Sequence, residues 1–291
     1  MKAFNIIVLA KQVPDTRNVG KDAMKADGTI NRATLPAIFN PEDLNALEQA
    51  LRIKDKIKNT HITLLTMGPS RAAEIIREGF YRGADDGILL TDRAFAGADT
   101  LATSYTLACA IRKIKDFNLI FSGRQAIDGD TAQVGPQVAE KLSVPQITYV
   151  EEVIDINKNK IVAKRRLENG IEIVEASLPL IVTVNSSAPC CRPRNAKLLM
   201  QYKHSKTLSE QQNISEDYIM MHPNRSYLTI KEWSINDINC DFLQLGLKGS
   251  PTKVKAIENV VFTVKDVKRI GSKDEEIEAL MIELINNHTI G

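Results

Sequence analysis

The sequence contains no apolar run of the roughly 18 residues that a membrane-spanning helix requires, so we expect no membrane span. Its four cysteines form neither a CxxC pair nor a disulfide framework, and its four histidines lie far apart, which argues against zinc and predicts no metal site. Basic residues (38) nearly balance acidic residues (36), so nucleic-acid binding is not expected either.

Familiar catalytic and phosphate-binding motifs are also missing. There is no GxGxxG, no GxxxxGK[ST] and no GxSxG segment. Asp128-Gly129-Asp130 begins like a calcium loop, but the twelfth position is Ala139 where a glutamate is needed. We therefore assign no catalytic residue and expect a bound cofactor to supply any chemistry.

The composition is that of an ordinary globular protein. Hydrophobic residues make up 43% and charged residues 25% of the 291 residues. The apolar stretch that follows Met1 is too short for a signal peptide and lacks a small-residue cleavage site. A cytoplasmic location is the resulting expectation.

Strand and helix patterns alternate through the first half of the chain. Continuous apolar runs at 6–9, 62–66, 87–90 and 119–121 are typical of strands covered on both faces. Amphipathic segments predict helices over 42–57, 70–80, 99–115 and 131–142. Asn40, as a cap, and Pro41 suit the start of the first helix. This alternation predicts an α/β fold with a doubly wound parallel sheet.

The pattern changes near residue 150. Runs at 153–156, 161–167 and 171–174, separated by turn signals, predict a meander of antiparallel strands at the sheet edge, and 180–184 predicts one more buried strand. Strand signals are weak beyond residue 186, and 273–287 fits a final amphipathic helix. We therefore predict an α/β domain over 1–185 and a C-terminal arm with helices over 186–291, packed on a partner.

Ligands of doubly wound sheets bind beyond the carboxyl ends of the strands. Four distinctive segments follow the predicted strands, at 10–16, 67–69, 92–100 and 122–135. The last is the richest, because its glycines permit close backbone approach and the next helix start offers free N–H groups to a phosphate. Polar side chains there suit ribose or ribityl hydroxyls: Asp128, Asp130, Thr131 and Gln133. The alternative, slightly favoured by the pattern alone, is a plain loop capped by Asp130 or Thr131.

Taken together, these segments resemble the beta subunit of electron-transfer flavoproteins, in the branch that includes bifurcating and nitrogen-fixation-associated members. The resemblance is carried by 11–16, 40–43, 67–69, 92–104, 123–136 and 246–252. It is nearly continuous over 2–184, patchy over 185–245, and lost beyond 256. It implies an adenine nucleotide alpha hydrolase-like fold.

The resemblance also implies a heterodimer with an alpha subunit that holds FAD, and electron relay between an acyl-CoA or other dehydrogenase and an acceptor. The beta subunit itself would bind AMP in a simple carrier, or a second FAD in a bifurcating protein that takes electrons from NADH. The second FAD is preferred because 124–135 and 92–100 look like the bifurcating branch. The implied cofactor contacts are Ala10, Asn40, Met67, Gly123, Arg124, Gln125, Ala126, Ile127, Asp128, Gly129, Asp130, Thr131, Ala132, Gln133 and Val134.

The segment 189–200 departs from the family pattern, which carries Asn-Glu-Pro-Arg-Tyr before a recognition loop whose leucine inserts into dehydrogenases. Without gaps that leucine falls at Ala196, and with a small shift it is Leu198, which we take as the docking residue. Equally, Leu198 and its neighbours would face the chain's own core or the alpha subunit. A hypothesis of another class is a stand-alone adenine-nucleotide-binding protein or hydrolase, which would bind ATP without flavin.

Overall fold

The computed structural model describes residues 3–15, 36–212, 223–252 and 268–287. Thr16, the last residue of the first distinctive segment, and 253–267, within the predicted arm, lie outside these ranges. Among the helices that are described, none has the length and apolar character needed to cross a membrane.

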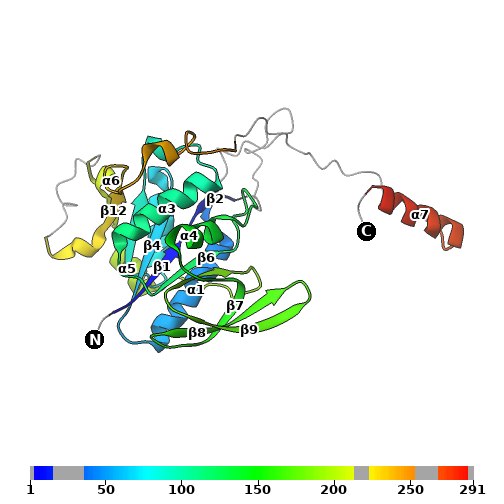
Figure 1. Ribbon diagram of the computed structural model, residues 1–291, viewed down its shortest axis with the longest axis horizontal. Coiled ribbons are helices and arrows are strands. Elements are labelled where there is room, and N and C mark those ends of the chain that lie inside the picture. Colours follow the sequence, from blue (N-terminus) through cyan, green and yellow to red (C-terminus); the bar gives the residue numbers. More distant parts are fainter. Residues whose placement is uncertain (1–2, 16–35, 213–222, 253–267, 288–291) are drawn as a thin grey trace.

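A twisted sheet forms the centre of the molecule, as Figure 1 shows. Its parallel core consists of β1 (Phe4–Leu9), β4 (Thr60–Met67), β5 (Asp86–Leu90) and β6 (Leu119–Gly123). The full strand order is β11-β12-β5-β4-β1-β6-β10-β7-β8-β9. The predicted α/β fold with a doubly wound parallel sheet is thereby confirmed.

Four helices follow these strands in the chain and cover the sheet: α1 (Pro41–Lys56), α2 (Ala73–Phe80), α3 (Thr100–Ile114) and α4 (Val134–Leu142). A 3₁₀ turn, Ser70–Ala72, precedes α2 and replaces the start of the helix predicted at 70. Side chains of β1 alternate between two cores. Ile6 and Val8 pack in the cluster that contains α1 and α2, whereas Ile7 and Leu9 pack in the one that contains α3 and α4. Burial on both faces explains the continuous apolar runs.

The predicted antiparallel extension is present as β7 (Gln146–Ile156), β8 (Lys160–Leu167) and β9 (Gly170–Ser177), each antiparallel to the next. The predicted buried strand at 180–184 is present as β10 (Leu180–Val184), which lies between β6 and β7 and is parallel to both. All of its residues are buried, and a strand without a polar face is stable inside the sheet rather than at its edge.

The opposite edge holds strands that the sequence analysis missed. β12 (Thr229–Trp233) pairs in parallel with β5, and β11 (Lys206–Thr207) pairs with β12. Only Ile230 of β12 is fully buried, so the strand carries little apolar signal. Part of the C-terminal segment therefore belongs to the main sheet, and the boundary at 185/186 stays a prediction.

The remaining described elements are short, apart from the last helix. They are β2 (Gln12–Pro14), β3 (Ala37–Phe39), α5 (Ala196–Tyr202), α6 (Leu208–Gln212), and 3₁₀ turns at Arg93–Phe95, Pro223–Leu228 and Phe242–Gln244. The helix predicted over 273–287 is present as α7 (Asp274–Asn286). Figure 1 shows α7 apart from the α/β body, and it has no buried residue.

The chain order places a crevice beside β1. From β1 the chain adds β4 and then β5 on one side, and then returns to add β6 on the other side of β1. The connection that follows β1 therefore leads toward one edge of the sheet, and the connection that follows β6 leads toward the other edge. In such folds, ligands bind beside the carboxyl ends of the two strands at which the connections diverge.

We predict that the core side chain of β6 contributes strongly to stability. Phe121 is fully buried, and β6 pairs with β1 and β10. Phe121→Ala should lower the free energy of unfolding by about 3–5 kcal/mol, because it removes an aromatic side chain and leaves a cavity. Ile173→Ala on β9, where the side chain is 68% exposed, should change it by less than about 0.5 kcal/mol. Urea unfolding measures both, and equal losses would contradict the placement of the core.

Candidate nucleotide pocket at the switch point

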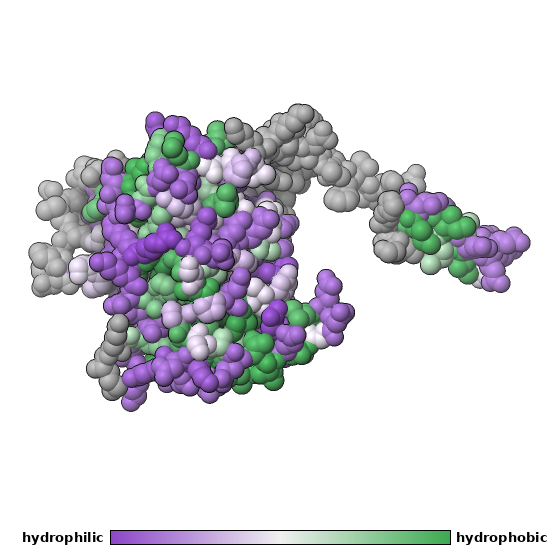
Figure 2. Space-filling model, viewed as in Figure 1, coloured by the Kyte–Doolittle hydropathy of each residue, from purple (hydrophilic) through white to green (hydrophobic). Residues whose placement is uncertain are grey.

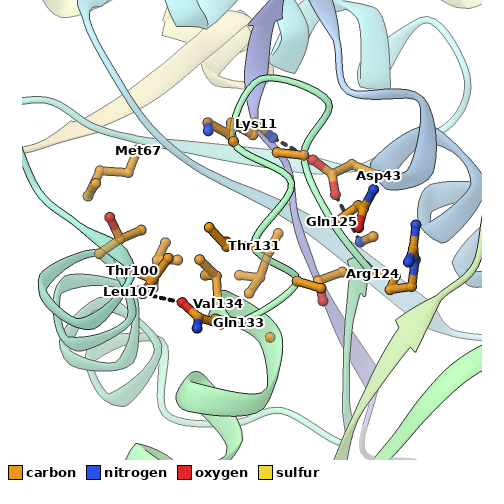
Figure 3. A pocket seen from close by; sticks show the side chains of 18 of the residues that line it. Lys11, Asp43, Met67, Thr100, Leu107, Arg124, Gln125, Thr131, Gln133 and Val134 are labelled. Carbon is orange, nitrogen blue, oxygen red and sulfur yellow. Dashed lines mark hydrogen bonds between the residues drawn. The ribbon is translucent and has the colours of Figure 1, made fainter. Parts of the chain in front are cut away.

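A cavity of about 350 Å³ opens beyond the carboxyl ends of β1, β4 and β6, beside the N-termini of α3 and α4. Figure 3 shows Thr131 and Val134 on one side of it and Met67, Thr100 and Leu107 on the other. Its position is the one that the strand order indicates. Its size lies within the range of small-molecule sites.

Most of the predicted contacts line this cavity. Those in the lining are Ala10, Met67, Gly123, Arg124, Gln125, Ala126, Gly129, Asp130, Thr131, Ala132, Gln133 and Val134. The remaining predicted residues, Asn40, Ile127 and Asp128, do not line it. The fold thus brings the segments after three separate strands to one site.

Asn40 and Asp128, which lie outside the lining, stabilise the loop that follows β6. The Asn40 side chain donates to the Gln125 carbonyl (2.9 Å) and accepts from the Ile127 N–H (3.3 Å). Although Asn40 occupies the cap position of α1, its side chain makes no capping hydrogen bond, which corrects the predicted cap. Asp128 forms an ion pair with Lys11 at 2.7 Å, joining the loop to the segment after β1.

The loop itself has an unusual backbone. Asp130 and Ala132 have positive φ angles of 48° and 53°, a left-handed conformation that is unfavourable for alanine and that occurs disproportionately at ligand sites. These residues cannot start a right-handed helix, so α4 begins at Val134 and not at the predicted residue 131. Neither Asp130 nor Thr131 is its cap, because the cap position is Gln133.

The N-terminus of α4 is left open toward the cavity. The Gln133 side chain makes no cap hydrogen bond and instead accepts from the Thr100 hydroxyl at 2.9 Å (Figure 3). By contrast, α3 is capped by Asp99, which accepts from the N–H groups of Leu101 and Ala102, each at 3.0 Å. The first N–H groups of a helix have no partner within it and, with the helix dipole, attract anions. The open α4 start therefore offers anion-binding capacity.

Ser122 supplies a second polar group at this position. Ser122 is 6% exposed and lines the cavity. Its hydroxyl has no hydrogen-bond partner among the described residues. A Cβ atom added to Gly135 would lie 2.8 Å from that hydroxyl and 2.7 Å from Thr183. Glycine in the first turn of α4 thus keeps the space around the hydroxyl open. Buried hydroxyls normally have a partner, which an ordered water or a bound ligand supplies where the protein does not.

Other lining residues were not among the predicted contacts: Leu9, Lys11, Asp43, Leu65, Ala98, Asp99, Thr100, Thr103, Leu107, Ser122 and Gly135. Lys11, Ser122, Gly135 and 98–100 fall in the distinctive segments after the strands, which is the signal that could have identified them. Leu65, Thr103 and Leu107 lie inside β4 and α3, where nothing in the sequence separates a cavity wall from core.

Comparison with known proteins decides the family. The family model described as "Electron transfer flavoprotein domain" matches residues 27–200, more than half of the chain. An "Electron transfer flavoprotein subunit beta" from Clostridium acetobutylicum is 44% identical over 252 residues, covering 87% of this chain and 86% of that protein. The chain belongs to the electron transfer flavoprotein beta-subunit family.

Two further members of this family carry more specific names. The "Caffeyl-CoA reductase-Etf complex subunit CarD" of Acetobacterium woodii is 43% identical over 251 residues, covering 86% of each chain. The "Protein FixA" of Bradyrhizobium diazoefficiens is 38% identical over 288 residues, covering 97% of this chain and 91% of that protein. Membership supports electron transfer as the role, a flavin or nucleotide as the cofactor and an alpha subunit as the partner.

We predict that this electron transfer flavoprotein subunit tolerates the loss of the Ser122 hydroxyl without losing stability. Ser122→Ala removes a buried group that has no partner among the described residues, so the free energy of unfolding of the nucleotide-free chain should stay the same or rise. Ser104→Ala is the matched control, because Ser104 is also buried but donates to the Leu101 carbonyl at 2.8 Å. The control should cost about 1 kcal/mol in urea unfolding. A similar loss in Ser122→Ala would show that its hydroxyl has a partner in the free protein.

Proposed function

We propose that the chain is a beta subunit that holds an adenine nucleotide in the cavity at the switch point and relays electrons together with its alpha subunit. The observation that supports this most directly is the uncapped start of α4 beside the Ser122 hydroxyl, which has no partner among the described residues. Together they provide backbone and side-chain hydrogen bonds for a phosphate. The family gives the electron-transfer role.

The cavity residues match the parts of a dinucleotide. The first N–H groups of α4 and Ser122 would hold phosphate, and the exposed side chains of Asp130 and Thr131 would bind sugar or ribityl hydroxyls. Apolar walls at Met67 and Leu107 suit a ring system. A bound flavin would supply the redox chemistry. The residues of this chain would bind and orient it, and none of them needs to act as an acid or base.

FAD is the preferred occupant and AMP is the alternative. The preference depends on the resemblance of 124–135 and 92–100 to the bifurcating branch, in which NADH is the electron donor. One relative belongs by its name to a caffeyl-CoA reductase complex and another to an acryloyl-CoA reductase. An acyl-CoA dehydrogenase is therefore the partner class that we propose for this chain.

The C-terminal segment is proposed to pack on the alpha subunit. Along α7 the side chains of Ile277, Met281, Ile282 and Ile285 are 44–52% exposed, and Figure 2 shows a hydrophobic band on this helix. A helix of 13 residues is only marginally stable alone in water. An alpha subunit that covered this face would stabilise it, which fits the predicted role of 186–291 as an arm.

The nucleotide content of the complex tests the proposal. We expect that the chain, purified with its alpha subunit and then denatured, releases two FAD and no AMP per heterodimer, as measured by chromatography. One FAD with one AMP would show a simple carrier instead. One FAD without any second nucleotide would contradict a nucleotide site in this subunit.

Variants of the loop locate that nucleotide. Asp128→Ala combined with Thr131→Ala should reduce nucleotide retention while leaving the fold intact. Thr131 lines the cavity, whereas Asp128, outside the lining, pairs with Lys11. Thr131→Ala alone therefore tests direct contact with the nucleotide, and Asp128→Ala alone tests stabilisation of the loop. Unchanged nucleotide content in the double variant, with an unchanged circular dichroism spectrum, would exclude this loop as the binding site.

Docking of a dehydrogenase is proposed to use α5. Leu198 is half-buried on this helix, whereas Met200 is 62% exposed. Tyr202, at the end of α5, packs against Phe80 with ring centroids 5.0 Å apart and ring planes tilted by 36°, which holds the helix against α2. The structure thus presents Met200 to solvent more fully than the predicted anchor.

We predict that Leu198→Ala slows electron transfer to a dehydrogenase without loss of flavin. Met200→Ala is the matched variant on the same helix. Comparing the two shows whether the half-buried Leu198 or the exposed Met200 anchors the dehydrogenase. Stopped-flow transfer rates measure both at equal flavin content. Wild-type rates in Leu198→Ala together with slow transfer in Met200→Ala would move the anchor to Met200, and normal rates in both would place docking elsewhere.

A further inference from the structure

The carboxylate of Asp43 joins the ends of two strands at the switch point. One oxygen accepts from the N–H of Lys11, just after β1, at 2.9 Å, and the other accepts from the N–H of Gly123, at the end of β6, at 2.8 Å. Asp43 lies in the first turn of α1, lines the cavity and is 6% exposed. A single buried side chain therefore spans the crevice between β1 and β6.

Neighbouring side chains of α1 continue this arrangement along the loop. Glu42 accepts from the N–H of Gln125 at 2.8 Å and from the Arg124 side chain at 3.1 Å. Asn40 accepts from the N–H of Ile127. The alternate N–H groups at 123, 125 and 127 are thus each held by the start of α1. These contacts fix the loop without using the open start of α4.

The close approach of the two segments depends on glycine. A Cβ atom at Gly123 would lie 2.5 Å from the Asp43 carboxylate and 2.8 Å from its backbone nitrogen. Such distances exclude any side chain at 123 unless the backbone moves. The Asp43–Gly123 contact is therefore built into the positions of α1 and β6.

We propose that Asp43 is a positioning residue, whose carboxylate fixes the segment after β1 against the nucleotide loop after β6 and so controls how tightly the cavity retains a nucleotide. This inference rests on the proposed nucleotide site. It adds to that site a specific group that the resemblance did not assign.

The ionisation of Asp43 gives the proposal a distinctive signature. Burial raises the pKa of Asp43 to about 7, against the opposing effect of the N–H groups of Lys11 and Gly123. The Asn40 side chain and the Lys11 charge also act to lower it. A neutral carboxyl group accepts hydrogen bonds more weakly than a carboxylate does. The connection between β1 and β6 should therefore weaken as the pH falls through about 7.

Other charged groups near Asp43 are already paired. Lys11 is paired with Asp128, and Glu42 with Arg124. The strands β10, β2 and β3 carry no ionisable side chain. On β4, His61 lies 4.0 Å from Asp85 at the opposite end of the sheet, and on β7 Glu151 pairs with Arg166. If binding changes with pH near 7, Asp43 is therefore the group to which we assign the change.

The proposal is tested by measuring how tightly AMP and FAD bind to the complex with the alpha subunit. Equilibrium dialysis gives the dissociation constants at about pH 6 and pH 8. If only the ionised form is competent, about a tenth of the protein is competent at the lower pH, so binding should be roughly tenfold weaker there. Asp43→Asn should bind weakly at both pH values and lose this dependence. Asp86→Asn, which removes a carboxylate that pairs with Lys231 outside the cavity, should keep it.

The comparison between variants removes the contribution of the ligand, because the phosphate of AMP itself titrates near pH 6. An equal pH dependence in wild type and Asp43→Asn would overturn the proposal. Tighter binding at the lower pH in the wild type alone would also overturn it, because the carboxylate would then repel the nucleotide.

A measurement without ligand separates this inference from the proposed function. Hydrogen exchange of the nucleotide-free complex, corrected for the intrinsic pH effect, should show the N–H groups of residues 123, 125 and 127 more protected in wild type than in Asp43→Asn at pH 8 but not at pH 6. If neither AMP nor FAD binds the wild type, the proposed function fails while this result still decides on the role of Asp43. If Asp43→Asn does not fold, the pH dependence of exchange in the wild type tests the proposal by itself. Exchange in the wild type that did not depend on pH would overturn the proposal.

Global stability offers an independent check of the ionisation, because complete unfolding exposes the buried Asp43 to water, whereas local opening of the loop breaks only its hydrogen bonds. The folded-state pKa of Asp43 lies above its ordinary value of 3.8, so the group contributes stability that is complete below about pH 4 and is lost as the pH rises through about 7. The amide that replaces the carboxyl group in Asp43→Asn cannot ionise. The Tm of Asp43→Asn should therefore rise relative to that of the wild type between pH 5 and pH 8, and a constant difference would contradict the raised pKa.

Discussion

The structure depends on one constraint at the centre of the sheet, which is that β1 must be covered on both faces while it pairs with parallel strands on both edges. Ile6 and Val8 face one helix layer, and Ile7 and Leu9 face the other. Parallel pairing on both sides forces the chain to reverse its direction of winding between β5 and β6. That reversal opens the crevice in which the candidate site lies.

The starts of α1, α3 and α4 meet at this crevice, and each satisfies its polar groups differently. Side chains at the start of α1 hold the loop after β6. The start of α3 is capped by Asp99, and the start of α4 is left open. Because buried N–H groups need partners, the uncapped start of α4 is where a ligand would complete the structure.

Asp99 also connects the cavity wall to the C-terminal segment. Besides capping α3, it accepts from the N–H and hydroxyl of Thr252 at 3.1 and 2.5 Å, while its own N–H donates to Ser250. Burial would raise the pKa of Asp99, but hydrogen bonds from Thr252, Ala102 and Leu101 hold it below its usual value. Ser250 and Thr252 are thus fixed beside the proposed nucleotide site.

Sequence by itself determined the elements whose signal is local. Apolar runs identified the parallel strands because both of their faces are buried, and the segments at their carboxyl ends contained most of the cavity lining. The resemblance of those segments gave the family, which the comparisons confirmed.

Tertiary structure alone decided the features that depend on distant partners. The place of β10 between β6 and β7, the pairing of β12 with β5 and the start of α4 at Val134 follow from packing or from backbone angles that local pattern does not encode. The same holds for Asp43, which the sequence places at a helix start and in a segment of family resemblance without indicating what its side chain contacts. Its function as a bridge arises because the fold brings Lys11 and Gly123, from separate strands, within hydrogen-bond distance of one carboxylate.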